Sequence, residues 1–475
     1  MLSSINDFSD RISPVLVKEL RQGMRAKLFV GLFLGLQIFL GVMLFSAVSA
    51  ATGNNPGGVI SGMIFTFFSI ILLVFQPLRG INALHGEIKD GTIDMMVLTR
   101  LNAWRIVFGK WISVAGQSTL FFTTIIPYLI LRYFFGGMNL FAELVALVLI
   151  FLLSLTLTAG TIGLSACTNV FIRGLLPILA IPALYVGAVI ASFSSLGGRS
   201  PYTWFTFSSG ESWIVLGVLF TAFFHVGYSM LSLGTSLIAP AAENHAIVRR
   251  IIALLLMAAA GTAAVFFPAY EEGAHITVML LIAVPAIVIG LTEAAPIIMA
   301  AHRPFQKFGP PGRFAGLFLT NSWSSGVIFS IVMFCAAVAS ILAHDAIRMD
   351  SESVTVLMAC LGALFFPAVW QALFFRGEGQ RLTHYLLILS ASGLIWVVLI
   401  SLSEAMDSDK FLWAFAWHPL AYQCMVVSNP PNESLVLTSL ILLLVIYFFI
   451  LSIKALRGFT LHKRQQDTPP HGLED

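Results

Sequence analysis

Long apolar runs constrain this sequence more than any motif does. A helix that crosses a lipid bilayer needs about 20 mostly apolar residues, and twelve stretches of the chain meet that requirement. They run near residues 28–49, 57–78, 104–131, 141–168, 174–193, 212–236, 249–268, 276–300, 320–343, 353–375, 383–404 and 433–453. The sequence therefore predicts an all-α integral membrane protein with about twelve transmembrane helices, preceded by an amphipathic interfacial helix.

Composition excludes a soluble enzyme. Hydrophobic residues make up 58% of the chain and charged residues only 10%, whereas about a quarter of the residues in soluble domains are charged. The four cysteines are scattered and are expected to be small apolar residues within helices. The sequence has no Walker A motif, no GxGxxG, no GxSxG and no HExxH. We therefore expect no cofactor, metal or nucleic acid to bind this chain.

The distribution of positive charge predicts the topology. If both termini are cytoplasmic, the outer segments hold only Arg132, Arg199, Arg348 and Lys410 of the 26 Lys and Arg residues, and the inner segments hold the other 22. Cytoplasmic segments of membrane proteins are rich in Lys and Arg. This sorting indicates a multi-pass protein of the cell (inner) membrane.

A basic amphipathic segment precedes the first run. Ser13 and Pro14 are typical of a helix start. The segment then carries an apolar stripe and an opposite basic face: Leu16, Val17, Leu20 and Met24, against Lys18, Arg21, Arg25 and Lys27. This pattern predicts a helix that lies on an anionic leaflet, and the alternative is a charged extension of the first span.

An internal repeat is indicated by two matched pairs of segments. Residues 101–104 (LNAW) and 320–323 (TNSW) start the third and ninth spans, 219 positions apart, and residues 200–204 and 418–422 precede the sixth and twelfth, 218 apart. Two units of six spans share one orientation and place a substrate path between them. The predicted segments are 1–27 (cytoplasmic N-terminus with the interfacial helix), 28–240 (first half), 241–455 (second half) and 456–475 (cytoplasmic tail, expected to be disordered).

The longest charged interruption of the N-terminal half runs from His85 to Lys110. Its apolar residues Ile93, Met96 and Val97 fall at helical spacing. The second-half counterpart, residues 302–313, is basic and contains Pro310-Pro311. Because proline disrupts helix interiors, this counterpart is predicted to be a poor helix.

These segments resemble the membrane subunits of ABC-2 type ABC transporters. Such permeases begin with an amphipathic helix carrying a phrase like PVLVKELRQ, here Pro14 to Gln22. Between the second and third spans they carry a Glu, a Gly-Thr pair, apolar residues and a Thr, followed by a Gly-Lys pair. The matching positions here are Glu87, Gly91-Thr92, Met95 to Leu98, Thr99 and Gly109-Lys110, so the resemblance covers residues 14–135. Arg100 stands where the family usually has proline.

The resemblance implies a coupling helix within residues 87–100 that docks on a separate ATP-binding subunit. We expect two copies of that ATPase, which would hold ATP and magnesium, and the unit would most simply be an exporter, with or without a further permease chain. The residues assigned to coupling are Glu87, Gly91, Thr92, Ile93, Asp94, Met96, Val97 and Thr99. Gly91 is expected to break the chain and Thr92 to cap the new helix, so that Ile93, Met96 and Val97 face the partner.

Polar residues inside the apolar runs are the remaining candidates. Glu293 and His225 are ionisable groups within predicted spans, and such groups are costly unless paired or functional. For Glu293 both a structural ion pair and a role in transport stay open, and for His225 a structural role is the alternative to function. Gln37, Gln117 and Gln371 are expected to form hydrogen bonds between helices.

Three other functions compete with a permease. An ion-driven secondary transporter needs ionisable groups near mid-membrane, and only His225 and Glu293 qualify. A membrane enzyme acting on lipid-linked substrates needs charged or His residues clustered at one membrane face, and the spacing of the outer acidic loops does not provide this. A structural or assembly subunit is the third alternative.

Overall fold

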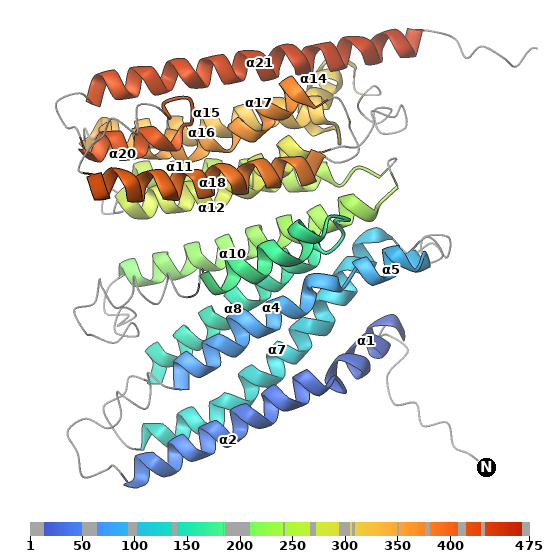
Figure 1. Cartoon of the computed structure of the whole chain (residues 1–475), viewed down its shortest axis with the longest axis vertical. Coiled ribbons are helices and arrows are strands. Elements are labelled where there is room, and N and C mark those ends of the chain that lie inside the picture. Colours follow the sequence, from blue (N-terminus) through green and yellow to red (C-terminus); the bar gives the residue numbers. More distant parts are fainter. Residues whose placement is uncertain are drawn as a thin grey trace, which may run out of the picture. The chain divides into compact units, whose positions relative to one another are not determined.

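The computed structural model describes residues 14–49, 64–93, 102–134, 140–183, 185, 210–240, 243–266, 272–293, 305, 309–348, 351–375, 381–406, 415–428 and 433–467. Every regular element within these ranges is a helix (Figure 1). Eleven of the described helices are long and apolar enough to cross a membrane. The predicted fifth span is represented by a shorter apolar helix, Phe171–Ala183. The all-helical, multi-pass character of the chain is therefore confirmed.

The chain divides into two compact units, Met1–Ala239 and Pro240–Asp475. The boundary predicted from the repeat, between residues 240 and 241, lies one residue away. Each unit is described separately below.

The first unit begins with α1 (Pro14–Met24), which is followed by the long helix α2 (Lys27–Ser49). The second apolar span covers Ile64–Lys89 and ends in α5 (His85–Lys89). The unit continues with α7 (Ala103–Tyr133), α8 (Leu140–Leu164), the π-helical turn η3 (Phe171–Leu175) and α10 (Gly210–Ile238). In Figure 1, α8 and α10 run side by side, and they are in contact.

The second span is not a uniform α-helix. After Ile70 the chain forms a π-helical turn, η1 (Ile71–Phe75), the short α4 (Gln76–Leu78) and a 3₁₀ turn, η2 (Arg79–Asn82). The hydroxyls of Ser154 and Thr161 on α8 donate to the carbonyls of Leu72 and Pro77, at 2.6 and 2.7 Å. These bonds satisfy carbonyls along the irregular segment, so the backbone between the span and α5 is held without regular helix geometry.

Two apolar clusters hold the first unit together. The larger combines Phe29 and Leu36 of α2 with Phe65 and Phe68 of the second span and Phe121 of α7. The smaller lies nearer α5, where Leu84 packs with Val107 of α7, Ile162 of α8 and Leu231 of α10. The smaller cluster therefore fixes the start of α5 against three long helices.

The second unit begins with α11 (Ala246–Phe266), α12 (Glu272–Thr292) and α14 (Gly309–Leu319). It continues with α15 (Trp323–Arg348), α16 (Ser351–Ala363), α17 (Phe365–Phe374) and α18 (Arg381–Met406). The short α20 (Leu420–Ser428) and the long α21 (Glu433–Asp467) complete it. Helices α12 and α15 touch at Gly290 and Gly326, where a Cβ on Gly326 would lie 1.9 Å from the Gly290 carbonyl oxygen.

Two predictions about the second unit were wrong. Pro310 and Pro311 do not prevent a helix, because both lie in the first turn of α14, where the missing N–H of proline has no intrahelical partner to lose. The predicted disordered tail is also helical through Asp467, as part of α21. Residues 456–467 contain no proline, so nothing in the sequence interrupts the helix before Pro469.

The three predicted interhelical glutamine bonds are confirmed. Gln37 on α2 accepts from the Tyr128 hydroxyl on α7 at 2.9 Å, and Gln117 on α7 accepts from Arg79. Gln371 on α17 donates to the carbonyl of Arg381 at 2.6 Å.

Candidate functional site

Lys110 connects three elements of the first unit at one end of its helices. Its ammonium group, on α7, lies 2.8 Å from Glu87 of α5 and 3.2 Å from Glu19 of α1. The side chains are 10%, 20% and 24% exposed, respectively. We call these three residues the first-unit ion cluster. One cation between two carboxylates connects the interfacial helix α1 and the end of the second span, α5, to the third span.

Close packing between α1 and α7 places Glu19 beside Lys110. Leu20 lies against Gly116, and Gly23 approaches Gln117 so closely that a Cβ would lie 2.0 Å from the Gln117 side-chain nitrogen. Small residues at both contacts allow the two helices to approach. Helix α1 is therefore separate from α2 and packs on α7, which disfavours a simple extension of the first span.

Arg79 forms a second connection between the same elements. Its guanidinium donates to the side chain of Gln117 and, at 3.3 Å, to the Gly23 carbonyl. It also lies 5.6 Å from the centre of the Phe29 ring, within cation–π range. Because Arg79 belongs to η2, it links the irregular end of the second span to both α1 and α7.

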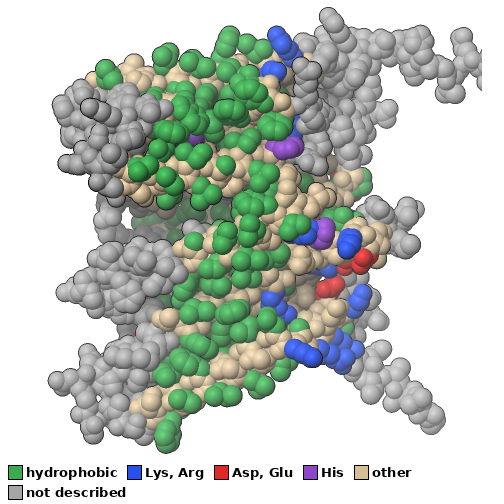
Figure 2. All heavy atoms as spheres, viewed as in Figure 1, with side chains coloured by type: hydrophobic (Ala, Val, Ile, Leu, Met, Phe, Trp, Pro, Cys, Tyr) green, Lys and Arg blue, Asp and Glu red, His purple; other side chains and the backbone are tan. Residues whose placement is uncertain are grey.

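A polar groove of about 550 Å³ runs between these elements. Its lining includes Glu19, Arg79, Glu87, Asp90 and Lys110. One oxygen of Glu87, Oε2, is buried and has no hydrogen-bond partner. Figure 2 shows Lys, Arg, Asp and Glu side chains gathered over α1 and α5, at one end of this unit. The groove presents both signs of charge beside a carboxylate oxygen that is still free to accept a hydrogen bond.

The local backbone of the predicted coupling segment is described as far as Ile93. Gly91 has a φ of +66° and ends the turn that follows α5, which agrees with its expected role as a chain break. Thr92 does not cap forward within the described part; its hydroxyl donates back to the Glu87 carbonyl at 3.1 Å. Ile93 was predicted to face a partner, but its side chain is buried within the unit. Asp94, Met96, Val97 and Thr99 lie outside the described residues.

The predicted interfacial residues lie on α1 as the pattern indicated. Lys18, Arg21 and Arg25 are exposed. Of the apolar stripe, Leu16 and Leu20 are half-buried and Met24 is exposed. Part of the stripe therefore covers α7 rather than lipid.

The second unit contains a different charge cluster. Glu293 follows α12 directly and pairs with both Arg249 and Arg250 of α11. Arg250 also donates to the Phe318 carbonyl and, at 2.6 Å, to the Ser325 hydroxyl. The three charged side chains are at most 3% exposed. We call Arg249, Arg250 and Glu293 the second-unit ion cluster. Of the two roles considered for Glu293, a structural ion pair or a part in transport, these contacts agree with the structural ion pair. His225 is fully buried in α10.

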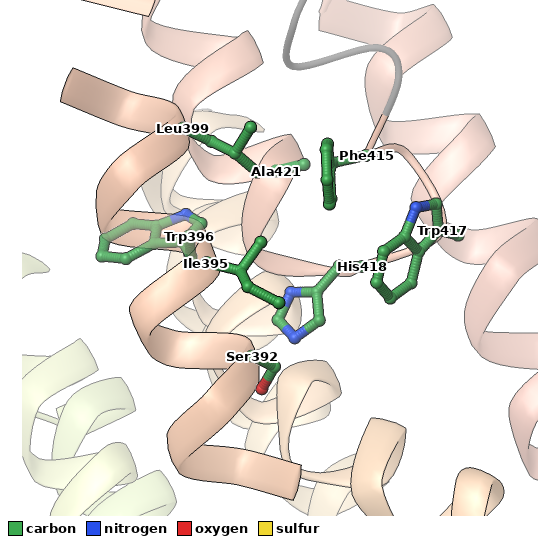
Figure 3. A pocket seen from close by; sticks show the side chains of 8 residues that line it. All are labelled: Ser392, Ile395, Trp396, Leu399, Phe415, Trp417, His418 and Ala421. Carbon is green, nitrogen blue, oxygen red and sulfur yellow. The ribbon is translucent and has the colours of Figure 1, made fainter. Parts of the chain in front are cut away.

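A small apolar pocket lies between α18 and the segment before α20 (Figure 3). Trp396, Phe415 and Trp417 form its aromatic walls, and the buried His418 extends between them towards Ser392. The Leu420 N–H donates to Nδ1 of His418 at 3.3 Å, while Nε2 has no partner. Burial lowers the pKa of His418 to about 4, so the imidazole is neutral near pH 7 and its proton is on Nε2.

Neither ion cluster was predicted as a set. The coupling motif contained Glu87 and Lys110, but nothing in the sequence paired them with Glu19, 91 positions before Lys110. The pair Arg249-Arg250 at the start of a span was a visible signal for a buried carboxylate partner. Among the described residues, no group of three or more His, Cys, Asp or Glu side chains could hold a metal ion.

No family model, curated protein or solved structure matches this chain.

Proposed function

We propose that this chain is the membrane-spanning permease subunit of an ABC-2 type ATP-driven transporter, with ATP hydrolysis on a separate subunit. The first-unit ion cluster carries the proposal. A partner that pushes on α5, at the end of the second span, would act on Glu87, and through Lys110 on α7 and α1 together. Packed elements joined by charge pairs move as a unit more readily than elements joined only by a flexible loop.

The second span is irregular where it approaches the coupling segment. The π, α and 3₁₀ turns between Ile71 and Asn82 interrupt the second span just before α5 in the chain. π-Helical turns are rare and often occur at functional sites. A displacement of α5 would therefore move the part of the span before Ile71 through a rearrangement of this irregular segment.

A two-fold repeat of six spans, twelve in total, is part of the proposal. Gly91 and Gly309 are the two glycines with positive φ within the described ranges, with values of +66° and +65°. They are 218 positions apart, close to the offsets of 219 and 218 found for the two segment pairs in the sequence. Both lie between the second and third spans of their halves. The same backbone feature at equivalent positions supports duplication.

The location proposed is the cell (inner) membrane, with both termini cytoplasmic. Lys18 of α1, Arg79 of η2 and Lys110 of α7 line one groove, and Figure 2 shows Lys and Arg side chains gathered at one end of the first unit, as expected for the cytoplasmic face. Glu293 forms ion pairs with Arg249 and Arg250, so it is not the unpaired intramembrane carboxylate that an ion-driven transporter would need.

Affinity purification of the full chain from its native membrane tests the proposal. We expect an ATPase with a phosphate loop and an LSGGQ signature to co-purify, and its ATPase rate to depend on the permease. A Gly91→Trp variant should lose assembly or stimulation, and Gly41→Trp, an exposed position on α2 with open space around its Cα, is the matched control away from the groove. Purification without any ATPase, together with a fully active Gly91→Trp variant, would contradict the proposal.

A further inference from the structure

The face of α5 opposite the first-unit ion cluster is basic. His85 and Lys89 are four positions apart on α5, so they share one side of the helix, while Glu87 and Asp90 line the groove on the other side. Arg173 of η3 lies close enough to His85 to interact with it electrostatically, as does Lys89. Elements η2 and η3 are in contact, and Gly174 lies against Ile81. His85, Lys89 and Arg173 therefore lie near one another, although Lys89 and Arg173 are 84 positions apart in the sequence.

These side chains hold unused hydrogen-bonding groups. Nη1 of Arg173 and Nδ1 of His85 are both buried, and neither has a hydrogen-bond partner. Leaving the buried N–H groups of Arg173 Nη1 unpaired is unfavourable. Within the described part of the chain, none of the three residues forms an ion pair with a carboxylate. The cluster therefore lacks the negative charge that the other two clusters supply internally.

The backbone at Arg173 is also unusual. Arg173 is the central residue of the π-helical turn η3, and such turns are concentrated at functional sites. The Phe171 N–H donates to the Asn169 side chain at 2.8 Å and the Arg173 N–H to the Asn169 carbonyl at 3.1 Å. These bonds fix the start of the turn and hence the position of Arg173.

We infer that His85, Lys89 and Arg173 bind a phosphate-type anion, either a lipid headgroup or free phosphate. Arginine and phosphate match in geometry and form strong charge-assisted hydrogen bonds. The cluster lies where the span Ile64–Lys89 ends and the helix Phe171–Ala183 begins. Basic pockets between helices at this depth are suited to anionic lipid headgroups. The inference does not depend on the proposed transport function.

Thermal unfolding of the purified full chain in detergent tests the site. The probes are phosphatidylglycerol, phosphatidylcholine as the neutral-headgroup control, and inorganic phosphate at matched ionic strength. We expect phosphatidylglycerol to raise the unfolding midpoint well above the effect of phosphatidylcholine. Arg173→Gln and Lys89→Gln should each raise the half-saturating phosphatidylglycerol concentration about fivefold, the effect expected for one basic residue near a headgroup. Arg105→Gln, an exposed residue of α7, is the matched control and should leave it unchanged.

The arms of this experiment separate the two sources. Stabilisation by phosphatidylglycerol alone assigns the site to a lipid headgroup, whereas stabilisation by inorganic phosphate that is lost in the same variants assigns it to the free anion. If Arg173→Gln fails to fold, Lys89→Gln retains the test, because Lys89 is exposed. Equal effects of both lipids and no effect of phosphate, or variants that respond like the unaltered chain, would overturn the inference.

Discussion

The two ion clusters have opposite composition and different surroundings. In the first unit one cation, Lys110, lies between two carboxylates, and the side chains are 10–24% exposed beside a polar groove. In the second unit one carboxylate, Glu293, lies between two arginines that are 1–3% exposed. Arg250 is additionally held by a carbonyl, by a hydroxyl and by the Phe329 ring, whose centre is 5.1 Å away.

This difference indicates different roles. The first-unit charges are partly buried but lie beside a polar groove, so water or a docking protein can reach them and replace a lost partner at a lower cost than inside a closed core. A fully buried pair cannot exchange partners without leaving a charge uncompensated. We therefore interpret the first-unit cluster as an adjustable connection and the second-unit cluster as a fixed one.

The largest effect is expected from Glu293→Gln. The substitution leaves Arg249 and Arg250 buried without their shared carboxylate, and breaking a buried pair in this way costs about 3–5 kcal/mol. Thermal unfolding and yield of the full chain in detergent measure the loss. Glu243→Gln is the matched control, because Glu243 pairs with His245 but its side chain is 39% exposed. A Glu293→Gln variant as stable as Glu243→Gln would remove the distinction between fixed and adjustable clusters.

Lys110→Gln should have a smaller effect on stability and a larger one on coupling. Removing the cation leaves Glu19 and Glu87 near each other, at a cost of about 2 kcal/mol, moderated by partial exposure. The proposed ATPase should still assemble with the variant, but its stimulation by the permease should fall. Lys18→Gln, an exposed basic residue on the same groove, should leave both measurements unchanged. Full stimulation in Lys110→Gln would contradict a connection through this cluster.

The sequence predicted local features better than these clusters. Apolar length located the spans, Ser13-Pro14 located the start of α1, and Gly91 marked a break in the chain. These depend on neighbouring residues only. The contact of Glu19 with Lys110 depends on α1 folding back on α7 at Leu20 and Gly116, which no local pattern encodes. Ile93 was assigned to an exposed face because helical spacing does not say which side other helices cover.

Substitutions of Gly91 and Gly309, the two glycines with positive φ, test whether the loops between the second and third spans of the two halves have the same backbone conformation. Gly91→Ala and Gly309→Ala should each destabilise the chain by about 1–2 kcal/mol, because residues with a Cβ disfavour the left-handed region. Neither Cα has a neighbouring atom that a Cβ would meet, so the cost is conformational. Gly86→Ala, inside α5 and also in open space, should be neutral or slightly stabilising. A large cost at one glycine and none at the other would argue against equivalent loops.

His418 offers the smallest effect and tests whether the second unit tolerates new charge. Its pKa is lowered by burial from 6.5 to about 4, so between these values the unfolded chain binds a proton that the folded chain does not. Stability is therefore fully present above about pH 6.5 and is lost as the pH falls towards 4. From pH 6.5 to 5.5 the loss is about 1 kcal/mol. Comparing unfolding of the unaltered chain and His418→Gln at the two pH values isolates this residue from other groups that titrate. If the two chains lose the same stability, protonation of His418 does not destabilise the folded chain. The pocket of the second unit then tolerates a new charge, unlike the second-unit ion cluster.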